Sequence, residues 1–131
     1  MPIRRVTSPA VTEAEPGLWS NCLVVDNIAY FSGLTARGKD NTTIDGADEY
    51  EQTKLIFEKY RALIGAAGGK MSDIVKLTIF VVDIANRKKV WDARREFFKG
   101  DFPACALVEV SDLAPGVLVE IEGIAHLGAG G

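Results

Sequence analysis

Apolar residues recur at helical spacing between residues 48 and 67, which predicts a helix with one apolar stripe. Acidic residues crowd its start, where the helix dipole favours negative charge, and the glycine pair 68–69 follows its last apolar position. The stripe consists of Ile56, Tyr60, Leu63, Ile64 and Ala67. A second helix is predicted over residues 87–98, where nearby glycine and proline residues end it.

Other apolar runs predict strands. A hairpin is expected at residues 23–32 around a polar turn, and there is room for a short leading strand near residues 3–6. Residues 73–83 predict a longer strand, apolar enough that we expect both of its faces to be covered. One face of it is expected to hold Val75, Leu77, Ile79 and Val81. Two further strands are expected at residues 104–110 and 117–127.

These elements run β-β-α-β-α-β-β and predict a two-layer α+β sandwich of two helices on one sheet. The 131 residues suit a single domain, 1–131, whose ends at 1–17 and 127–131 we expect to be loosely ordered. The net charge of −3 argues against a nucleic-acid partner. With no apolar run of membrane-spanning length, no secretory signal and no disulfide pattern, we expect a cytoplasmic protein without a membrane partner.

The last predicted strand carries two carboxylates in an otherwise apolar stretch. Glu120, Glu122 and His126 share one face of it. Buried carboxylates need water, a charged partner or a cleft, so two interpretations stay open. The face either belongs to an edge strand and is solvated, or is ion-paired with lysine or arginine, or it holds a general acid–base whose pKa is raised by partial burial. Because His126 is the only histidine, we expect no metal site.

Other candidate groups each have a structural and a functional interpretation. Cys105 is either a small buried apolar residue or a nucleophile, although no neighbour in the sequence would lower the pKa of its thiol. Gly33 can let a backbone or a ligand approach closely. Trp19 and Trp91 suit core packing, a subunit interface or a wall of a binding site.

Several short segments also occur in a distinctive order along the chain. They are Tyr30-Phe31-Ser32-Gly33, Gly68-Gly69 followed by Asp73 to Val81, Phe97-Phe98, Phe102-Pro103-Ala104 and Val119 to Ala125. In this order and spacing they resemble the Rid family, the reactive-intermediate deaminases also known as L-PSP endoribonuclease-like proteins. The resemblance runs from about residue 18 to residue 125, which is almost the whole chain.

The resemblance implies a chorismate-mutase-like α+β fold and a homotrimer, with the sheets around a central barrel and ligand clefts between subunits. Active members hydrolyse enamines and imines derived from amino acids, such as 2-aminoacrylate, to 2-keto acids and ammonia. They use no cofactor. An arginine holds the substrate carboxylate, and a glutamate on the last strand positions water and transfers protons.

Residue by residue, Glu120 matches the family glutamate, and Gly33 matches the glycine whose backbone lines the cleft. Trp19 stands where the family usually has tyrosine, and Trp91 stands where many active members have asparagine. A short Pro-Gly loop joins the last two predicted strands, so we expect these strands to be neighbours in the sheet. Cys105 and Glu120 are then expected to line the same intersubunit cleft.

The chain departs from the family at the motif Pro-Ala-Arg, which is Pro103-Ala104-Cys105 here. A thiol cannot grip a carboxylate as a guanidinium does, so we expect slow hydrolysis of 2-aminoacrylate. Arg94, one turn from Trp91, is either a solvated helix residue or a displaced positive charge.

The sequence thus predicts a Rid-like deaminase of a different enamine or imine, such as an aminomuconate-like intermediate with a ring or a longer chain. Glu120 would be its acid–base group. Two alternatives stay open. One is a non-catalytic trimer that binds or senses a small ligand. The other is an endoribonuclease, which rests on the family label alone and which the acidic charge balance opposes.

Overall fold

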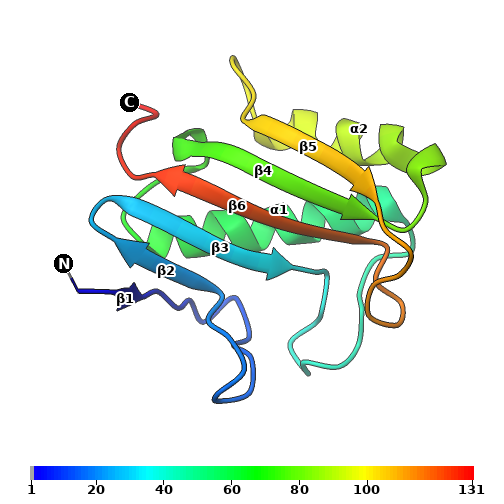
Figure 1. The fold of residues 1–131 in the computed structure, drawn as a ribbon, viewed down its shortest axis with the longest axis horizontal. Helices are drawn as coiled ribbons and strands as arrows, with labels where there is room; N and C mark the ends of the chain where they lie inside the picture. Colours follow the sequence, from blue (N-terminus) through cyan, green and yellow to red (C-terminus); the bar gives the residue numbers. More distant parts are fainter. Residues whose placement is uncertain (1) are drawn as a thin grey trace.

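The computed structural model describes residues 2–131 and forms two layers, a sheet and a pair of helices on one of its faces (Figure 1). The strands are β1 (Arg4–Arg5), β2 (Cys22–Val25), β3 (Ile28–Leu34), β4 (Ile74–Val81), β5 (Ala104–Glu109) and β6 (Val119–His126). The helices are α1 (Glu49–Ala66) and α2 (Arg87–Phe97), with short 3₁₀ turns η1 (Met71–Asp73) and η2 (Ile84–Asn86). The α+β sandwich predicted from the sequence is confirmed, with the short leading strand.

Helix α1 begins and ends at residues whose chemistry explains both ends. The Asp48 side chain accepts a hydrogen bond from the Glu51 amide at 2.9 Å and so caps the first turn. After the last turn, Gly68 takes a φ of 94°, which glycine adopts at little cost. Within residues 2–131, neither helix is long and apolar enough to cross a membrane.

The hydrophobic core lies between the helices and the sheet. Its largest fully buried members include Phe57 and Tyr60 from α1, Leu77 and Ile79 from β4, and Ile121 from β6. The Tyr60 hydroxyl donates a 2.8 Å hydrogen bond to the Ile121 carbonyl, so the buried phenol also satisfies a polar group. This contact ties α1 directly to β6.

The last two strands were expected to be neighbours in the sheet, but they are not. The sheet runs β1-β2-β3-β6-β4-β5, so β4 lies between β5 and β6. Strand β5 pairs parallel to β4, whereas β6 pairs antiparallel to both β3 and β4. The reason is that α2 carries the chain back to the free edge of β4, which leaves the gap between β3 and β4 for β6.

One further detail of β4 corrects the sequence analysis. Val75 was expected to share a face with Leu77, but a register shift between Ile74 and Lys76 buries Ile74 and leaves Val75 40% exposed. The expectation that the opposite face of β4 is covered concerns neighbouring subunits and stays a prediction. Among residues 2–131 no helix packs on this face, and Phe80 there is only partly buried.

Residues of the segments 1–17 and 127–131 contact the rest of the domain, while their expected loose order stays a prediction. Val6 and Val11 are buried against the core. At the other end, the Gly130 amide donates a 2.7 Å hydrogen bond to the Asp73 carboxylate. These contacts supply the burial and pairing that local composition does not reveal. Residue 1 lies outside the described part of the chain.

Gln52 on α1 connects three separate parts of the backbone. Its Nε2 donates to the carbonyls of Gly46 at 3.2 Å and Gly116 at 3.1 Å, and its Oε1 accepts from the Leu118 amide at 2.9 Å. The side chain is 2% exposed, so water cannot replace these partners. Gln52 therefore fixes the loop that leads into β6.

Replacing Gln52 with leucine is expected to destabilise the fold by about 3 kcal/mol, because it leaves buried backbone groups unpaired. Urea denaturation measures the change. A Glu51→Gln variant, altered at an exposed neighbour, serves as the control and should differ from wild type by no more than about 0.5 kcal/mol. Equal stability of Gln52→Leu and Glu51→Gln would contradict the assigned role.

Candidate functional site

Glu120 lies on β6, an interior strand of the sheet. Successive side chains of β6 alternate between the two faces, so Val119 and Ile121 are buried under the helices while Glu120 and Glu122 point to the uncovered face. The interpretation of these carboxylates as an edge-strand face is therefore wrong. Glu120 is only partly exposed, whereas Glu122 is exposed.

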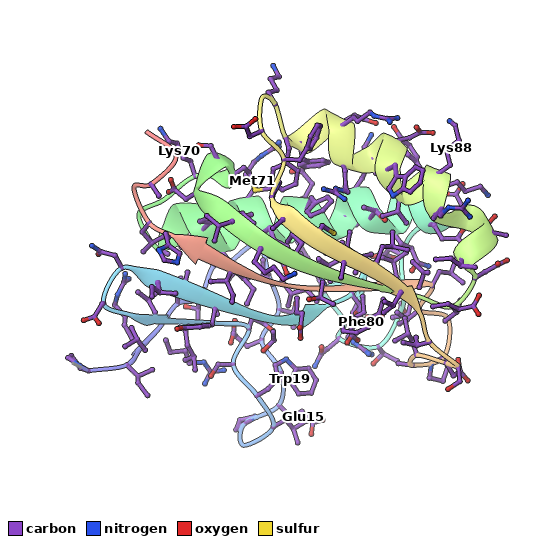
Figure 2. The ribbon with its side chains drawn as sticks, turned by 45° about the horizontal axis from the view of Figure 1, so that its top comes forward. Glu15, Trp19, Lys70, Met71, Phe80 and Lys88 are labelled. Atoms are coloured by element: carbon purple, nitrogen blue, oxygen red, sulfur yellow. The ribbon has the colours of Figure 1, made fainter. Side chains whose placement is uncertain are left out.

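The carboxyl of Glu120 lies over the bare backbone of Gly33. A methyl group at Gly33 would lie 2.6 Å from Oε2 of Glu120 and 2.9 Å from its Cδ. Strand β3 has a register shift between Phe31 and Leu34, next to this contact. On the other side, Glu120 pairs in register with Phe80, which Figure 2 labels near the end of β4.

The electrostatic surroundings of Glu120 favour its protonated form. Burial raises the pKa of this carboxyl, the nearby charge of Glu122 adds to the rise, and Arg37 opposes it. A carboxyl with a raised pKa is better suited to take up a proton and give it back than an ordinary glutamate. Arg37 was not among the residues singled out from the sequence. The signal that could have indicated it is its position four residues after Gly33.

Trp19 lies on the loop before β2, which projects from the sheet in Figure 2. Its ring is 50% exposed, so it is not a core residue, and its Nε1 donates to Oδ1 of Asn21 at 3.2 Å. Trp19 lines a small cavity together with Gly33 and Arg37. Trp19, Gly33 and Glu120 thus form one cluster, which we call the Glu120 cluster.

Cys105 belongs to a second cluster on the other side of the sheet. In the parallel β4–β5 pair it stands next to Leu77, and it packs against the core. Burial raises the pKa of its thiol, although Arg94 and Lys76 oppose the rise. A protonated, half-buried thiol is a poor nucleophile, which favours the structural interpretation of Cys105.

The second cluster also contains charged and aromatic side chains. A cavity of about 190 Å³ is lined by Trp91, Arg94, Arg95 and Phe102. The guanidinium carbon of Arg94 lies 5.7 Å from the centroid of the Phe102 ring, and Trp91 is 40% exposed. We call Cys105, Trp91, Arg94 and Phe102 the Arg94 cluster.

Within one chain the two clusters do not meet. Glu120 and Cys105 were expected on neighbouring strands, but β4 separates them and their side chains leave opposite faces of the sheet. The cause is the crossover of α2, which sets β5 at the edge of the sheet beyond β4. A common cleft for Glu120 and Cys105 therefore requires two copies of the chain.

Three other side chains with reactive groups are those of His126, Cys22 and Ser32. His126 is exposed at the end of β6. Burial raises the pKa of the Cys22 thiol to about 11, against the effect of Arg4. The Ser32 hydroxyl donates to the Ser20 carbonyl, so it is already engaged. Among residues 2–131, no three histidine, cysteine or acidic side chains gather as a metal site would require.

Replacing Gly33 with alanine is expected to lower the rate of the deamination proposed below about 10²-fold. The added methyl group forces the Glu120 carboxyl to move. The stability of the fold should change little, since the end of a flexible side chain can give way. Gly65→Ala in α1 is the matched control, with no atom within 4 Å of the new methyl group. It should keep full activity and gain about 0.5–1 kcal/mol of stability.

Comparison with known proteins agrees with this fold. The family model for endoribonuclease L-PSP matches residues 12–127. A protein of unknown function from Pseudomonas aeruginosa is 36% identical, with a TM-score of 0.86 over 97% of this chain and 94% of its own. YyfA from Yersinia pestis, of the conserved Rid protein family, is 33% identical, with a TM-score of 0.87 over 96% and 100%. TdcF from E. coli, solved with bound serine, is 25% identical, with a TM-score of 0.85 over 94% and 98%. The resemblance found in the sequence is thereby confirmed, and the chain belongs to the Rid family of L-PSP endoribonuclease-like proteins.

Proposed function

We propose that this protein is a hydrolytic deaminase of a small enamine or imine other than 2-aminoacrylate. The observation that carries the proposal is the position of Glu120, whose carboxyl lies over the backbone of Gly33 and whose pKa is raised by burial. Both features suit a group that moves a proton beside a bound substrate.

In the proposed reaction, the Glu120 carboxylate removes a proton from a water molecule while the water oxygen bonds to the imine carbon. The same carboxyl then protonates the nitrogen, which gives a carbinolamine. Glu120 next passes the hydroxyl proton of this intermediate to the nitrogen, the C–N bond breaks as the carbonyl forms, and ammonia leaves. An enamine first takes a proton on carbon and becomes the imine. Imine and water become a carbonyl compound and ammonia, so the atoms balance without a cofactor.

We propose that the active site lies between subunits of a homotrimer, as the family resemblance implies. The uncovered face of the sheet supports this, because the apolar side chains of Tyr30 and Val108 are 45% and 42% exposed on it. In this arrangement the Arg94 cluster of one protomer faces the Glu120 cluster of the next. Trp19 and Trp91 then form apolar walls of the cleft.

Arg94 is proposed to supply the positive charge that position 105 lacks. Its guanidinium packs on Phe102, and its charge reaches the Cys105 thiol. A guanidinium carried by α2 holds a carboxylate in a different place from one carried by β5. This difference supports a substrate other than 2-aminoacrylate. The ring of Trp91 provides an aromatic wall against which a larger substrate could pack.

Light scattering of the purified protein is expected to give three times the chain mass of 14.2 kDa at micromolar concentration. Charged substitutions on the uncovered face, such as Val108→Glu, should reduce the mass to that of one chain, and deamination should be lost with it. A monomeric wild type that is fully active would contradict an intersubunit site.

The proposed function is tested by release of ammonia and of a carbonyl product. Enamines and imines are generated in place by amino-acid oxidases and lyases from a panel of amino acids, with small, long and cyclic side chains. We expect faster release with long or cyclic compounds than with 2-aminoacrylate. Equal rates with and without the protein across the panel would overturn the proposal.

The residue at position 105 favours one second candidate, a trimer that binds a small ligand without turnover. Cys105 offers no positive charge to a carboxylate, because a thiol is neutral and a thiolate is negative, and burial raises the pKa of this thiol. A protein of this kind would bind keto acids that correspond to amino acids of the panel, as measured by calorimetry, and would release no ammonia. The two measurements together separate the candidates.

A further inference from the structure

A second arginine, outside the set chosen from the sequence, lies in the Glu120 cluster. Arg37 stands three residues after the end of β3 and lines the same small cavity as Gly33 and Trp19. We propose that Arg37 binds a carboxylate of the substrate beside Glu120. The inference rests on the proposed function only in taking Glu120 as the reacting centre.

The backbone that carries Arg37 is held firmly in place. From α1, the ammonium of Lys59 donates to the Thr35 carbonyl at 2.6 Å and to the Arg37 carbonyl at 2.8 Å. Between them, the carbonyl of the buried residue Ala36 accepts from the Asp45 amide at 2.9 Å. A carboxylate-binding side chain on backbone held at three successive residues is well positioned to select its ligand.

The charges around Arg37 leave this cavity positive. Burial and, to a smaller extent, the neighbouring charge of Arg37 lower the pKa of Lys59 to about 8, against the opposing effect of Asp45. The Asp45 carboxylate lies over Gly38 instead of pairing with either cation. Throughout residues 2–131, no carboxylate lies within ion-pair distance of Arg37 or Lys59. A bound anion would relieve the repulsion between the two cations.

The shape of the cavity indicates which part of a ligand enters it. Its volume of about 30 Å³ admits a group of the size of a carboxylate and not a whole substrate. The guanidinium of Arg37 offers the planar pair of donors that a carboxylate accepts. The rest of the ligand would lie over Gly33, next to the Glu120 carboxyl. With Arg94 in the other cluster, the two arginines favour a substrate with two acidic groups.

The test compares binding of 2-oxobutyrate with binding of its neutral amide, 2-oxobutanamide, by calorimetry. In Arg37→Gln, the Kd of 2-oxobutyrate is expected to rise tenfold or more, while the Kd of the amide stays unchanged. Lys39→Gln is the matched control, because it removes the same charge from an exposed residue of the same loop. It should bind both compounds as wild type does.

Unchanged binding of 2-oxobutyrate in Arg37→Gln would overturn the proposal. So would wild-type protein that binds none of 2-oxobutyrate, 2-oxoglutarate and benzoate. Failure of the proposed function is distinguishable, because Glu120→Gln should lower turnover about 10²-fold or more and still bind 2-oxobutyrate. Binding that depends on Arg37 in a protein without turnover would leave Arg37 as a ligand-binding residue and remove only the deaminase.

Discussion

Turnover of the protein's enamine or imine substrate is expected to fall about 10²- to 10⁴-fold when Glu120 is replaced by glutamine, the range for loss of a positioned acid–base group. Glutamine keeps the size of the side chain over Gly33 but cannot accept and return a proton. The matched control is Glu122→Gln, on the same strand and face but exposed. It should retain turnover within a few-fold of wild type.

The pH dependence of turnover gives the Glu120 prediction a second readout. Because burial raises the pKa of Glu120, the activity of wild type should fall on acidification through a pKa above the usual value for glutamate. Removing the neighbouring charge in Glu122→Gln should shift this limb to lower pH. A limb that stays in place in Glu122→Gln, or full turnover in Glu120→Gln, would contradict the assignment.

The same raised pKa predicts that Glu120 costs stability at neutral pH. Glu120 binds its proton more tightly in the folded protein than in the unfolded protein. Its favourable contribution to the free energy of unfolding is therefore present at low pH and is lost as the pH rises through the folded-state pKa. Glu120→Gln should therefore be more stable than wild type at pH 7, with the difference shrinking below the unfolded pKa. Urea denaturation at several pH values measures this as part of the same experiment.

The second large effect is expected from moving the positive charge beside position 105. In Arg94→Leu, the KM for a carboxylate-bearing substrate should rise about 10- to 100-fold, as for loss of a charged hydrogen bond. Cys105→Arg alone should gain little, because the new guanidinium stands beside Arg94 and repels it. Cys105→Arg in the Arg94→Leu background should recover binding and shift preference towards 2-aminoacrylate.

The control for this series is Lys88→Leu, which removes one charge from the exposed start of α2 (Figure 2). It should leave KM unchanged. Binding of 2-oxoglutarate adds a direct measure, because its second carboxylate should make it bind more tightly than 2-oxobutyrate. Loss of this advantage in Arg94→Leu is expected, whereas its persistence would show that Arg94 is a solvated helix residue.

Much of the secondary structure follows from local pattern. The apolar stripe that ends at Ala67 predicts α1, because a helix with this spacing buries one face whatever it packs against. The hairpin of β2 and β3 follows from two apolar runs around a short polar turn. Glu120 stood out for the same reason, since a carboxylate in an apolar strand needs an explanation.

The features that the sequence analysis missed all depend on contacts between distant residues. Strand alternation places Cys105 on one face or the other only once its partner strand is known, and pairing with β4 turns it towards the helices. The shift in register before Lys76 has the same effect on Val75, because one inserted residue reverses every face before it.

The chain by itself thus determined its elements, its family and its acid–base candidate, because these depend on short-range pattern and on motif order. The tertiary structure decided the strand order, the separation of the two clusters and the place of Arg37 beside Glu120. The position of Arg37 depends on a loop held by Lys59 from α1, more than twenty residues further along the chain. No local rule relates such positions, since hydrogen bonds across the fold bring them together only after the sheet and helices have packed.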